Sequence, residues 1–270
     1  MSFYTSLNGL KNAQTDLGVI SHNIANVETN GFKKSNTQFA DIVVGSAFTN
    51  PKLTQGIGAT VEAIVQNFAL GPIEQTGSAL DIAITGDGFF STSGSVSGET
   101  LYTRNGAFMM DATGFIHDGS NNRLQVFPTD TAGTVTSTTP VSAQIPLTNG
   151  AGSEFISVTV SENGNVNAGY ADGSVNVIGK IALASFTTPT GLKQVGSSNW
   201  QVTGVSGAPT LGEPGVGLYG DLLSGALERS NVDIAEELVS LITAQRNFQA
   251  NAKAIDTATQ ISQTVINLRT

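Results

Sequence analysis

The stretch "SHNIANVETNGFKK", residues 21–34, lies where a helical pattern near the N-terminus ends. It is rich in amide side chains, breaks at the pair Asn30-Gly31 and closes on Phe32 and two lysines. Asn-Gly is a strong turn signal, because both residues tolerate a positive φ. A helix that stops so markedly, so early in the chain, is the feature that the rest of the sequence has to explain.

Residues 3–26, which precede this stop, follow the pattern of an amphipathic helix. Apolar residues recur at seven-residue intervals on one face, two more lie between them, and most other positions are polar. This stripe consists of Phe3, Leu7, Leu10, Leu17, Ile20 and Ile24.

The C-terminal segment mirrors the first. From about Asn231 a second stripe comprises Ile234, Leu238, Leu241, Phe248, Ala252 and Ile255, and continues with a small drift in phase through Ala258, Ile261, Val265 and Leu268. Candidate N-caps precede it at Ser230, Asn231 and Asp233. A helix of roughly 35 residues spans about 50 Å, which is long for a globular domain.

Between the two helices the apolar period changes to two. Short strands are expected at 59–68, 79–90, 101–110, 123–128, 155–160 and 180–186. Hairpin turns are expected at 111–114, 161–165 and 171–174, a polar connection at 130–153 and a loop at 207–217. The sequence thus predicts a mixed α and β protein, with long N- and C-terminal helices and a central β-rich domain.

Charge and composition exclude several classes of function. The chain contains 12 Lys and Arg and 21 Asp and Glu, which gives a net charge of −9. This negative charge disfavours a nucleic-acid partner. The absence of cysteine excludes disulfides and Cys-ligated metals. No secretory signal peptide is recognisable at the N-terminus, and no apolar run reaches the roughly 18 residues of a membrane span. Composition alone therefore favours a cytoplasmic protein without membrane insertion.

Residues suited to catalysis are few. The only histidines are His22, expected on the first helix, and His117, which sits beside Asp118 without an identifiable nucleophile. Asp81 and Asp87 could form a carboxylate pair, but the glycines around Asp87 are more simply read as a turn. "GVGLYG" at 215–220 matches a nucleotide-binding pattern but lacks the preceding buried strand. We therefore predict no catalytic residues, no metal site and no cofactor.

The two terminal helices point instead to assembly. Their apolar stripes are narrow, and their other faces carry few charge pairs that would stabilise them in isolation. They can pair with each other, pair with copies from neighbouring subunits, or order on meeting a partner. A helical hairpin capping a monomeric β-domain is the simple alternative. A secreted carbohydrate-binding domain is a rival of another class, although one tryptophan and four tyrosines are few for it.

Four segments, in order along nearly the whole chain, resemble the signatures of the bacterial flagellar rod and hook axial proteins. The first is "NIANVETNGFKK" (23–34), similar to the family pattern N-x-A-N-x-x-T-x-G-F-K. The others are "GSALDIAITGDGFF" (77–90), "YTRNGAF" (102–108) and "SGALERSNVDIAEELVSLITAQRNFQANAKAI" (224–255). The residues that match the first pattern are Asn23, Ala25, Asn26, Thr29, Gly31, Phe32 and Lys33.

This resemblance implies an architecture and a site. In the family, the terminal helices form an inner coiled-coil layer around a central channel, and a β-rich domain faces outward. It implies an N-terminal helix at 1–30, a linking segment at 31–75, a β-rich outer domain at 76–225 and a C-terminal helix at 226–270. The first helix would stop near 26–29 so that the chain can leave the tube wall, with Phe32 buried as an anchor. Inner-tube packing is expected from Phe3, Leu7, Leu10, Leu17, Ile24, Ile234, Leu238, Leu241, Phe248, Ile255, Val265 and Leu268.

The resemblance also implies partners and a location. Family members polymerise with themselves and leave the cell unfolded, through the flagellar type III export apparatus, without a cleaved signal. This would place the chain outside the cell, in contact with rod, hook cap and hook–filament junction proteins.

Within the family, the two ends of the chain and the short segment 41–56 look most like a hook protein. The distal rod protein, the alternative, is expected to carry a longer insertion there. A length of 270 residues suits a rod protein, so a hook protein of this size would lack the usual outer β-domain.

Overall fold

The computed structural model describes residues 2–43, 56–94 and 98–267. The chain divides into two compact units. Unit 1 comprises residues 1–27, 34–67 and 232–270, and unit 2 comprises residues 28–33 and 68–231. The chain therefore passes between the units four times, and each unit is built from segments that are far apart in the sequence.

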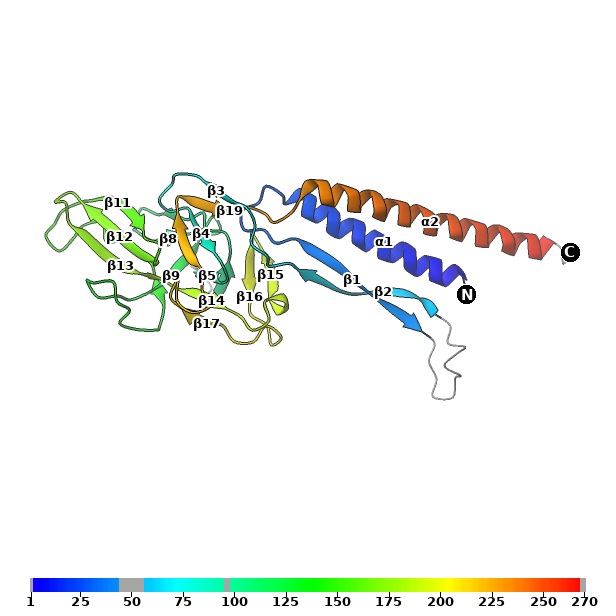
Figure 1. Ribbon diagram of the computed structural model, residues 1–270, viewed down its shortest axis with the longest axis horizontal. Helices are drawn as coiled ribbons and strands as arrows, with labels where there is room; N and C mark the ends of the chain where they lie inside the picture. Colours follow the sequence, from blue (N-terminus) through cyan, green and yellow to red (C-terminus); the bar gives the residue numbers. More distant parts are fainter. Residues whose placement is uncertain (1, 44–55, 95–97, 268–270) are drawn as a thin grey trace. The chain divides into compact units, whose positions relative to one another are not determined.

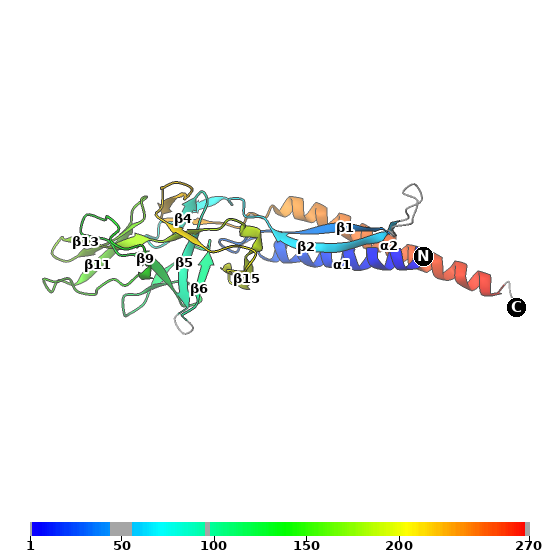
Figure 2. The ribbon, with the colours of Figure 1, turned by 90° about the horizontal axis from the view of Figure 1, so that it is seen from below.

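Unit 1 contains the two long helices and one β-hairpin. The helices are α1 (Ser2–Ala25) and α2 (Ile234–Asn267), and the hairpin strands are β1 (Ser35–Val43) and β2 (Gly56–Gln66). The helices lie side by side in both views, with the hairpin beside them (Figures 1 and 2). The predicted terminal helices and central β-rich region are thereby confirmed, while a coiled-coil packing of the helices stays a prediction.

The N-terminus of α2 is capped by its own sequence. The Asp233 carboxylate accepts hydrogen bonds from the backbone amides of Ala235 at 2.8 Å and Glu236 at 3.2 Å. Two of the amides left unpaired at a helix start are thus satisfied, and the acidic residues Glu236 and Glu237 in the first turn suit the positive end of the helix dipole. Of the three cap candidates in the sequence, Asp233 makes these bonds.

Residues 31–75, expected to link the helix to the β-domain, contain the hairpin of unit 1. β1 and β2 are antiparallel, with Ser35 opposite Gln66 and Val43 opposite Gly56. β1 did not stand out in the sequence, because its apolar residues are few and both of its faces are partly exposed. The hairpin packs beside α1: Asn12 on the helix donates to the carbonyl of Ala59 on β2 at 2.8 Å.

Among the residues that the structure describes, unit 2 contains the remaining strands and one 3-10 turn. The strands are β3 (Ile73–Gln75), β4 (Ile82–Thr85), β5 (Phe89–Gly94), β6 (Thr100–Thr103), β7 (Met109–Met110), β8 (Ile116–His117), β9 (Asn122–Phe127), β10 (Val141–Ser142), β11 (Phe155–Val160), β12 (Asn165–Tyr170), β13 (Val175–Ile181), β14 (Leu183–Ser185), β15 (Lys193–Gly196), β16 (Asn199–Gln201), β17 (Thr210–Gly212), β18 (Asp221–Ser224) and β19 (Ala226–Glu228), and the turn is η2 (Pro189–Gly191). The longest path of paired strands runs β11-β12-β13-β9-β5-β6-β16-β15. β18 pairs with β4, and β19 pairs with β3.

The three predicted turns are confirmed. In each, a glycine amide donates to the carbonyl three residues earlier: Gly114 to Asp111 at 3.0 Å, Gly164 to Ser161 at 2.8 Å and Gly173 to Tyr170 at 2.9 Å. The last two enclose β12, so the hairpin order β11-β12-β13 follows directly from the turn positions.

Three predicted strands are each divided in the structure: 101–110 contains most of β6 and all of β7, 180–186 contains the end of β13 and β14, and 79–90 contains β4 and the start of β5. The segment 79–90 divides into β4 and β5, which pair with different partners, β18 and β9 among them. Between them, Gly86 has a φ of +155° and its α-carbon approaches the Gly220 backbone so closely that a Cβ there would lie 2.9 Å from the Gly220 Cα. The alternating apolar pattern runs through this break, which is why it predicted a single strand.

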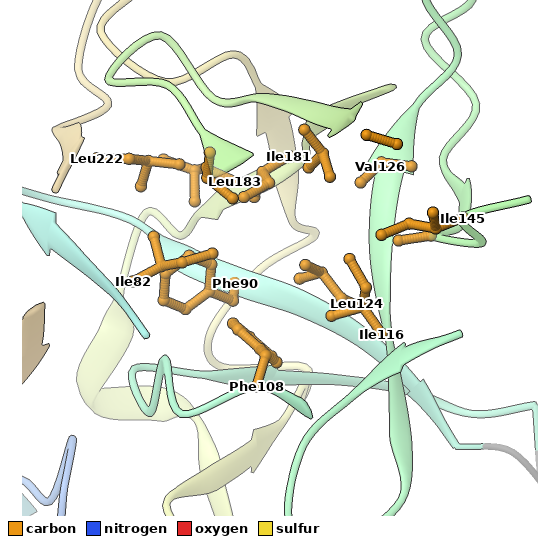
Figure 3. Packing of buried hydrophobic residues seen from close by; sticks show 14 of the residues in the cluster. Ile82, Phe90, Phe108, Ile116, Leu124, Val126, Ile145, Ile181, Leu183 and Leu222 are labelled. Carbon is orange, nitrogen blue, oxygen red and sulfur yellow. The ribbon is translucent and has the colours of Figure 1, made fainter. Parts of the chain in front are cut away.

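The main core of unit 2 is an apolar cluster between the sheets (Figure 3). It joins Phe90 of β5 with Leu124 and Val126 of β9, and Leu183 of β14 with Leu222 of β18, all of them buried. A second cluster collects aromatic rings around Trp200, which is fully buried. Burial on this scale supplies the driving force that holds the short strands of unit 2 in one fold.

Candidate functional site

The motif residues fall into two groups, one in each unit. Asn23, Ala25 and Asn26 belong to unit 1, while Thr29, Gly31, Phe32 and Lys33 belong to unit 2. The motif is thus the part of the chain in which α1 ends and the chain passes into unit 2. Each group is described within its own unit.

The end of α1 is closed by short-range hydrogen bonds. The amide of Asn26 donates to the carbonyl of Asn23 at 3.0 Å, and that of Val27 to Ile24 at 3.3 Å, a tighter spacing than in the helix interior. The Asn26 side chain donates to the carbonyl of His22 at 2.8 Å. Asn26 thus bonds a carbonyl in the last turn of the helix, which suits a residue at a helix stop.

Asn23 connects three elements of unit 1. Its Nδ2 donates to the carbonyl of Ser35 on β1 at 2.9 Å and to Oε2 of Glu237 on α2 at 3.2 Å. The amide of Ser35 donates back to its Oδ1 at 2.9 Å. Asn23 is 1 % exposed and Glu237 4 % exposed, so both the amide and the carboxylate are buried with partners. A shorter, longer or apolar side chain could not make all three bonds.

Lys34 supplies the positive charge beside this cluster. Its Nζ lies 3.2 Å from Oε2 of Glu236 and 3.8 Å from Oε1 of Glu237. The Glu236 contact is solvent-exposed and contributes little to stability, whereas Glu237 is buried and needs a nearby cation.

In unit 2 the chain turns at Gly31. This residue has a φ of +66°, and its amide donates to the carbonyl of Glu228 at 2.8 Å. A Cβ at Gly31 would lie 2.5 Å from the backbone nitrogen of Asn105. Both the conformation and the space thus require glycine. Phe32, the next residue, is buried.

Glu228 is the centre of the polar network in unit 2. Its Oε1 accepts hydrogen bonds from Nζ of Lys33 at 2.5 Å and from the amide of Gly71 at 2.9 Å. Nζ of Lys33 also donates to the carbonyl of Ala69 at 2.8 Å. Lys33 is 0 % exposed and Glu228 1 % exposed, so this ion pair is fully removed from water.

A second cation reaches the same carboxylate. Nη1 of Arg104 lies 3.5 Å from Oε2 of Glu228 and 2.9 Å from the carbonyl of Gly86. Burial lowers the pKa of Lys33, and Arg104 lowers it further, while the Glu228 carboxylate opposes both effects. The pKa of Arg104 is also lowered, because burial outweighs the opposing effect of the Glu228 and Asp87 carboxylates. Glu228 therefore compensates two buried positive charges.

Three residues of these networks were not among the predicted site residues: Glu228, Arg104 and Glu237. Each lies inside a segment that resembles a family signature, "ALER", "YTRNGAF" or "AEEL". The signal for Glu228 is a carboxylate that directly follows two apolar strand residues, Ala226 and Leu227. Neither its partner nor its burial could be read from that pattern.

The residues predicted to pack the inner tube differ in exposure. Leu7, Leu10, Leu17, Ile24, Leu241, Phe248 and Ile255 are half-buried, whereas Phe3, Ile234, Leu238 and Val265 are exposed. Leu268 lies outside the described residues. Ala13, Ile20 and Ala244, which are buried, complete the contact within unit 1.

His117 and Asp118 make hydrogen bonds within their own turn. Nδ1 of His117 bonds the backbone oxygen of Asp118 at 2.8 Å, and the Asp118 carboxylate accepts from Ser120 and Asn122. Among residues 2–43, 56–94 and 98–267 there is no group of three or more side chains suited to a metal ion. Over the same ranges, no helix is long and apolar enough to cross a membrane.

Replacing Gly31 tests the turn. Gly31→Ala should destabilise unit 2 by about 2–5 kcal/mol, because it adds a positive-φ penalty and a steric clash with Asn105. The measurement is urea unfolding followed by the fluorescence of Trp200, which lies in unit 2. Gly77→Ala is the matched control, since Gly77 also has a positive φ, +78°, but open space around it. Equal losses in the two variants would show that the close contact at Gly31 is unimportant.

Removing the charge of Glu228 tests the ion network. Glu228→Gln should cost about 3–5 kcal/mol of unfolding free energy, because Lys33 and Arg104 would remain buried without a counter-charge. Glu74→Gln, at an exposed carboxylate that pairs with Arg229, should cost about 0–1 kcal/mol. The same Trp200 unfolding curves give both values. A loss in Glu228→Gln no larger than in Glu74→Gln would contradict the central role of this carboxylate.

Three family models match the chain. One described as "Flagella basal body rod protein" matches residues 3–33, and one described as "Flagellar hook protein FlgE/F/G D1 domain" matches residues 83–168. A third, "Flagellar basal body rod FlgEFG protein C-terminal", matches residues 223–268. The first match contains the Asn23 and Gly31 positions, and the third contains Glu228 and Glu237.

Relatives match over their full length. The flagellar basal-body rod protein FlgG of Bacillus subtilis is 36 % identical, over 99 % of this chain and 98 % of the relative. The rod protein FlgG of Agrobacterium fabrum is 32 % identical over 95 % of each chain. The flagellar hook protein FlgE of Escherichia coli is 27 % identical over 100 % of each.

A crystal structure of the Helicobacter pylori flagellar hook protein FlgE2 covers 72 % of this chain and 43 % of that one, at 14 % identity and a TM-score of 0.24, a level that supports no structural argument. The conclusion rests on the sequence matches, which extend over nearly every residue. The chain belongs to the family of bacterial flagellar rod and hook proteins.

Proposed function

We propose that this flagellar axial subunit polymerises helically into the flagellar hook, the flexible joint that transmits motor torque to the filament. The observation that carries the proposal is the row of exposed apolar side chains on α2. Ile234, Leu238 and Ile242 follow one another at four-residue spacing, and each is about half exposed, at 46 %, 45 % and 50 %. Apolar residues gathered in this way mark a surface that another molecule covers.

The C-terminal part of α2 supports the same proposal. Residues 259–267 are all exposed, including Ile261, Val265 and Ile266. A short helical segment without packing is only marginally stable in water, so a neighbour must cover it in the working assembly. Contacts that are repeated between copies without closing into a ring build a filament.

In this proposal the predicted inner-tube residues act in two ways. The half-buried ones, such as Leu17, Leu241 and Phe248, hold α1 against α2 in one subunit. The exposed ones, such as Phe3 and Leu238, contact neighbouring subunits. The resulting coiled-coil layer lines the central channel, and the β-rich region, proposed at 76–225, forms the outer layer.

The choice of hook over distal rod rests on the hairpin. Only residues 44–55 lie between Val43, which ends β1, and Gly56, which begins β2. A distal rod protein is expected to carry a longer insertion there. The distal rod remains a second candidate, because rod relatives match end to end over about 280 aligned positions, whereas the alignment with the Escherichia coli hook protein needs 411.

The remaining parts of the proposal follow from this assembly. The chain leaves the cell unfolded through the flagellar type III export apparatus, without a cleaved signal peptide, and adds to the growing structure outside. Its partners are further copies of itself and the rod, hook cap and hook–filament junction proteins. No cofactor takes part.

A charge placed on the exposed row tests assembly. Ile242→Asp should abolish polymerisation, because a carboxylate would have to be buried unpaired at the contact between subunits. The monomer should keep its helix content by circular dichroism, since Ile242 is half exposed within unit 1. Asn247→Asp, five residues further and so on another part of the helix surface, is the control. Filaments of Ile242→Asp as abundant as wild type, by sedimentation and electron microscopy, would contradict the proposed contact.

Deleting the gene decides between hook and rod. We expect electron micrographs of basal bodies from such cells to show complete rods without hooks, because hook subunits add only after the rod. Truncated rods would instead make the chain a distal rod protein. Restoring the gene on a plasmid should restore hooks, which controls for effects on neighbouring genes.

A further inference from the structure

A cavity of about 230 Å³ lies within unit 2. Its walls combine aromatic rings with one buried cation. The residues that matter here are Phe68, Asp87, Phe89, Arg104, Phe186 and Leu218. None of them is assigned a role in the assembly proposed above.

The cation in the wall is Arg104, which has hydrogen-bonding capacity to spare. It is 3 % exposed, and a guanidinium group carries five N–H donors. Within the described residues, both of its hydrogen bonds, to Gly86 and to Glu228, are made by Nη1. Nε is buried and has no partner. The edge of the guanidinium formed by Nε and Nη2 is therefore without an acceptor, and buried donors in native proteins rarely stay so.

The rest of the cavity suits an apolar group. The Phe89 ring lies beneath the Arg104 guanidinium, with 5.2 Å from its centroid to Cζ, and packs edge-to-face against Phe68 and Phe186 at 5.4 Å and 5.6 Å. Leu218 lines the same cavity although its side chain is 79 % exposed. An exposed leucine in the cavity wall can pack against a ligand, and the burial of its apolar surface then favours binding.

The charges around the cavity select the ligand. Lys33 and Arg104 carry two buried positive charges against the single charge of Glu228, and the exposed Asp87 at the cavity wall offsets part of the excess. A singly charged, planar acceptor fits this balance better than a phosphate, which would bring more negative charge against Asp87. Nε is closed off from solvent, whereas Nη2, which also has no acceptor among the described residues, is not, so Nη2 can donate to one oxygen of a carboxylate in the cavity.

We propose that this cavity is a receptor for a carboxylate carried on an apolar group. The carboxylate accepts from Nη2 of Arg104, and the apolar part lies against Phe89, Phe186 and Leu218. Such a group could be a free small molecule or an acidic side chain with apolar neighbours on a second copy of this chain. The receptor does not depend on the assembly proposed above.

Trp200 provides the signal for a test. It is the only tryptophan, and its ring lies 5.6 Å from Phe68 and 5.7 Å from Phe89, both in the cavity wall. The full-length protein, kept dilute, is titrated with phenylacetate while Trp200 fluorescence is recorded. The neutral, nearly isosteric phenylacetamide is the matched control. We expect saturable binding of phenylacetate, and binding of phenylacetamide weaker by about tenfold or more, because a charge-assisted bond is lost.

Two results overturn the proposal: no saturable change with phenylacetate, or equal binding of the two compounds, which would make the cavity merely apolar. A variant locates the site without disturbing the buried network. Leu218→Ala should weaken phenylacetate several-fold, while Leu147→Ala, at an exposed leucine that does not line the cavity, should leave it unchanged. Equal affinities in both variants would place the binding elsewhere and also overturn the proposal.

A last arm separates the two sources of the carboxylate. Polymerisation is followed by light scattering with saturating phenylacetate or with phenylacetamide. Slowing by phenylacetate alone identifies the occupant as a side chain of a second copy, whereas equal rates identify a free carboxylate. Both results require the phenylacetate binding that the titration measures. If the protein does not polymerise at all, the proposed function is contradicted, while the result of the titration still stands.

Discussion

The burial of Glu228 between two cations is the constraint on which unit 2 depends. A carboxylate that is 1 % exposed must be neutralised and fully hydrogen-bonded, or its desolvation would outweigh the gain from folding. Lys33, Arg104 and the amide of Gly71 meet that requirement, and the carbonyl of Glu228 holds the amide of Gly31. Three separate parts of the chain are thereby fixed around one residue.

The sequence predicts the two ends of the molecule well and its interior less well. Both helices follow from local periodicity, and the three turns follow from glycine placed after polar residues, because these signals lie within a few positions of each other. The break inside 79–90 could not be predicted, since it comes from the close approach of Gly86 to Gly220. The hairpin strand β1 was missed because neither of its faces is consistently buried.

The same limit applies to the site. The motif indicated a helix stop at Asn26 and a special backbone at Gly31, which are local properties. It gave no partner for Lys33, because Glu228 lies 195 residues away. Asn23 likewise reaches Glu237 across 214 residues. Distances of this kind depend on the tertiary fold, and polarity alone would have placed all four residues on the surface.

The long separation in sequence between Lys33 and Glu228 also determines when the two residues can pair during folding. When a chain emerges N-terminus first, most of the strands of unit 2 precede Glu228. The buried ion pairs cannot form until Glu228 has emerged as well. Contacts between residues so far apart in sequence also form slowly. The chain must lose the entropy of closing a long loop before the contact contributes favourable energy. A nearly complete chain therefore lacks these buried ion pairs, and unit 2 reaches its full stability only once β19 is in place.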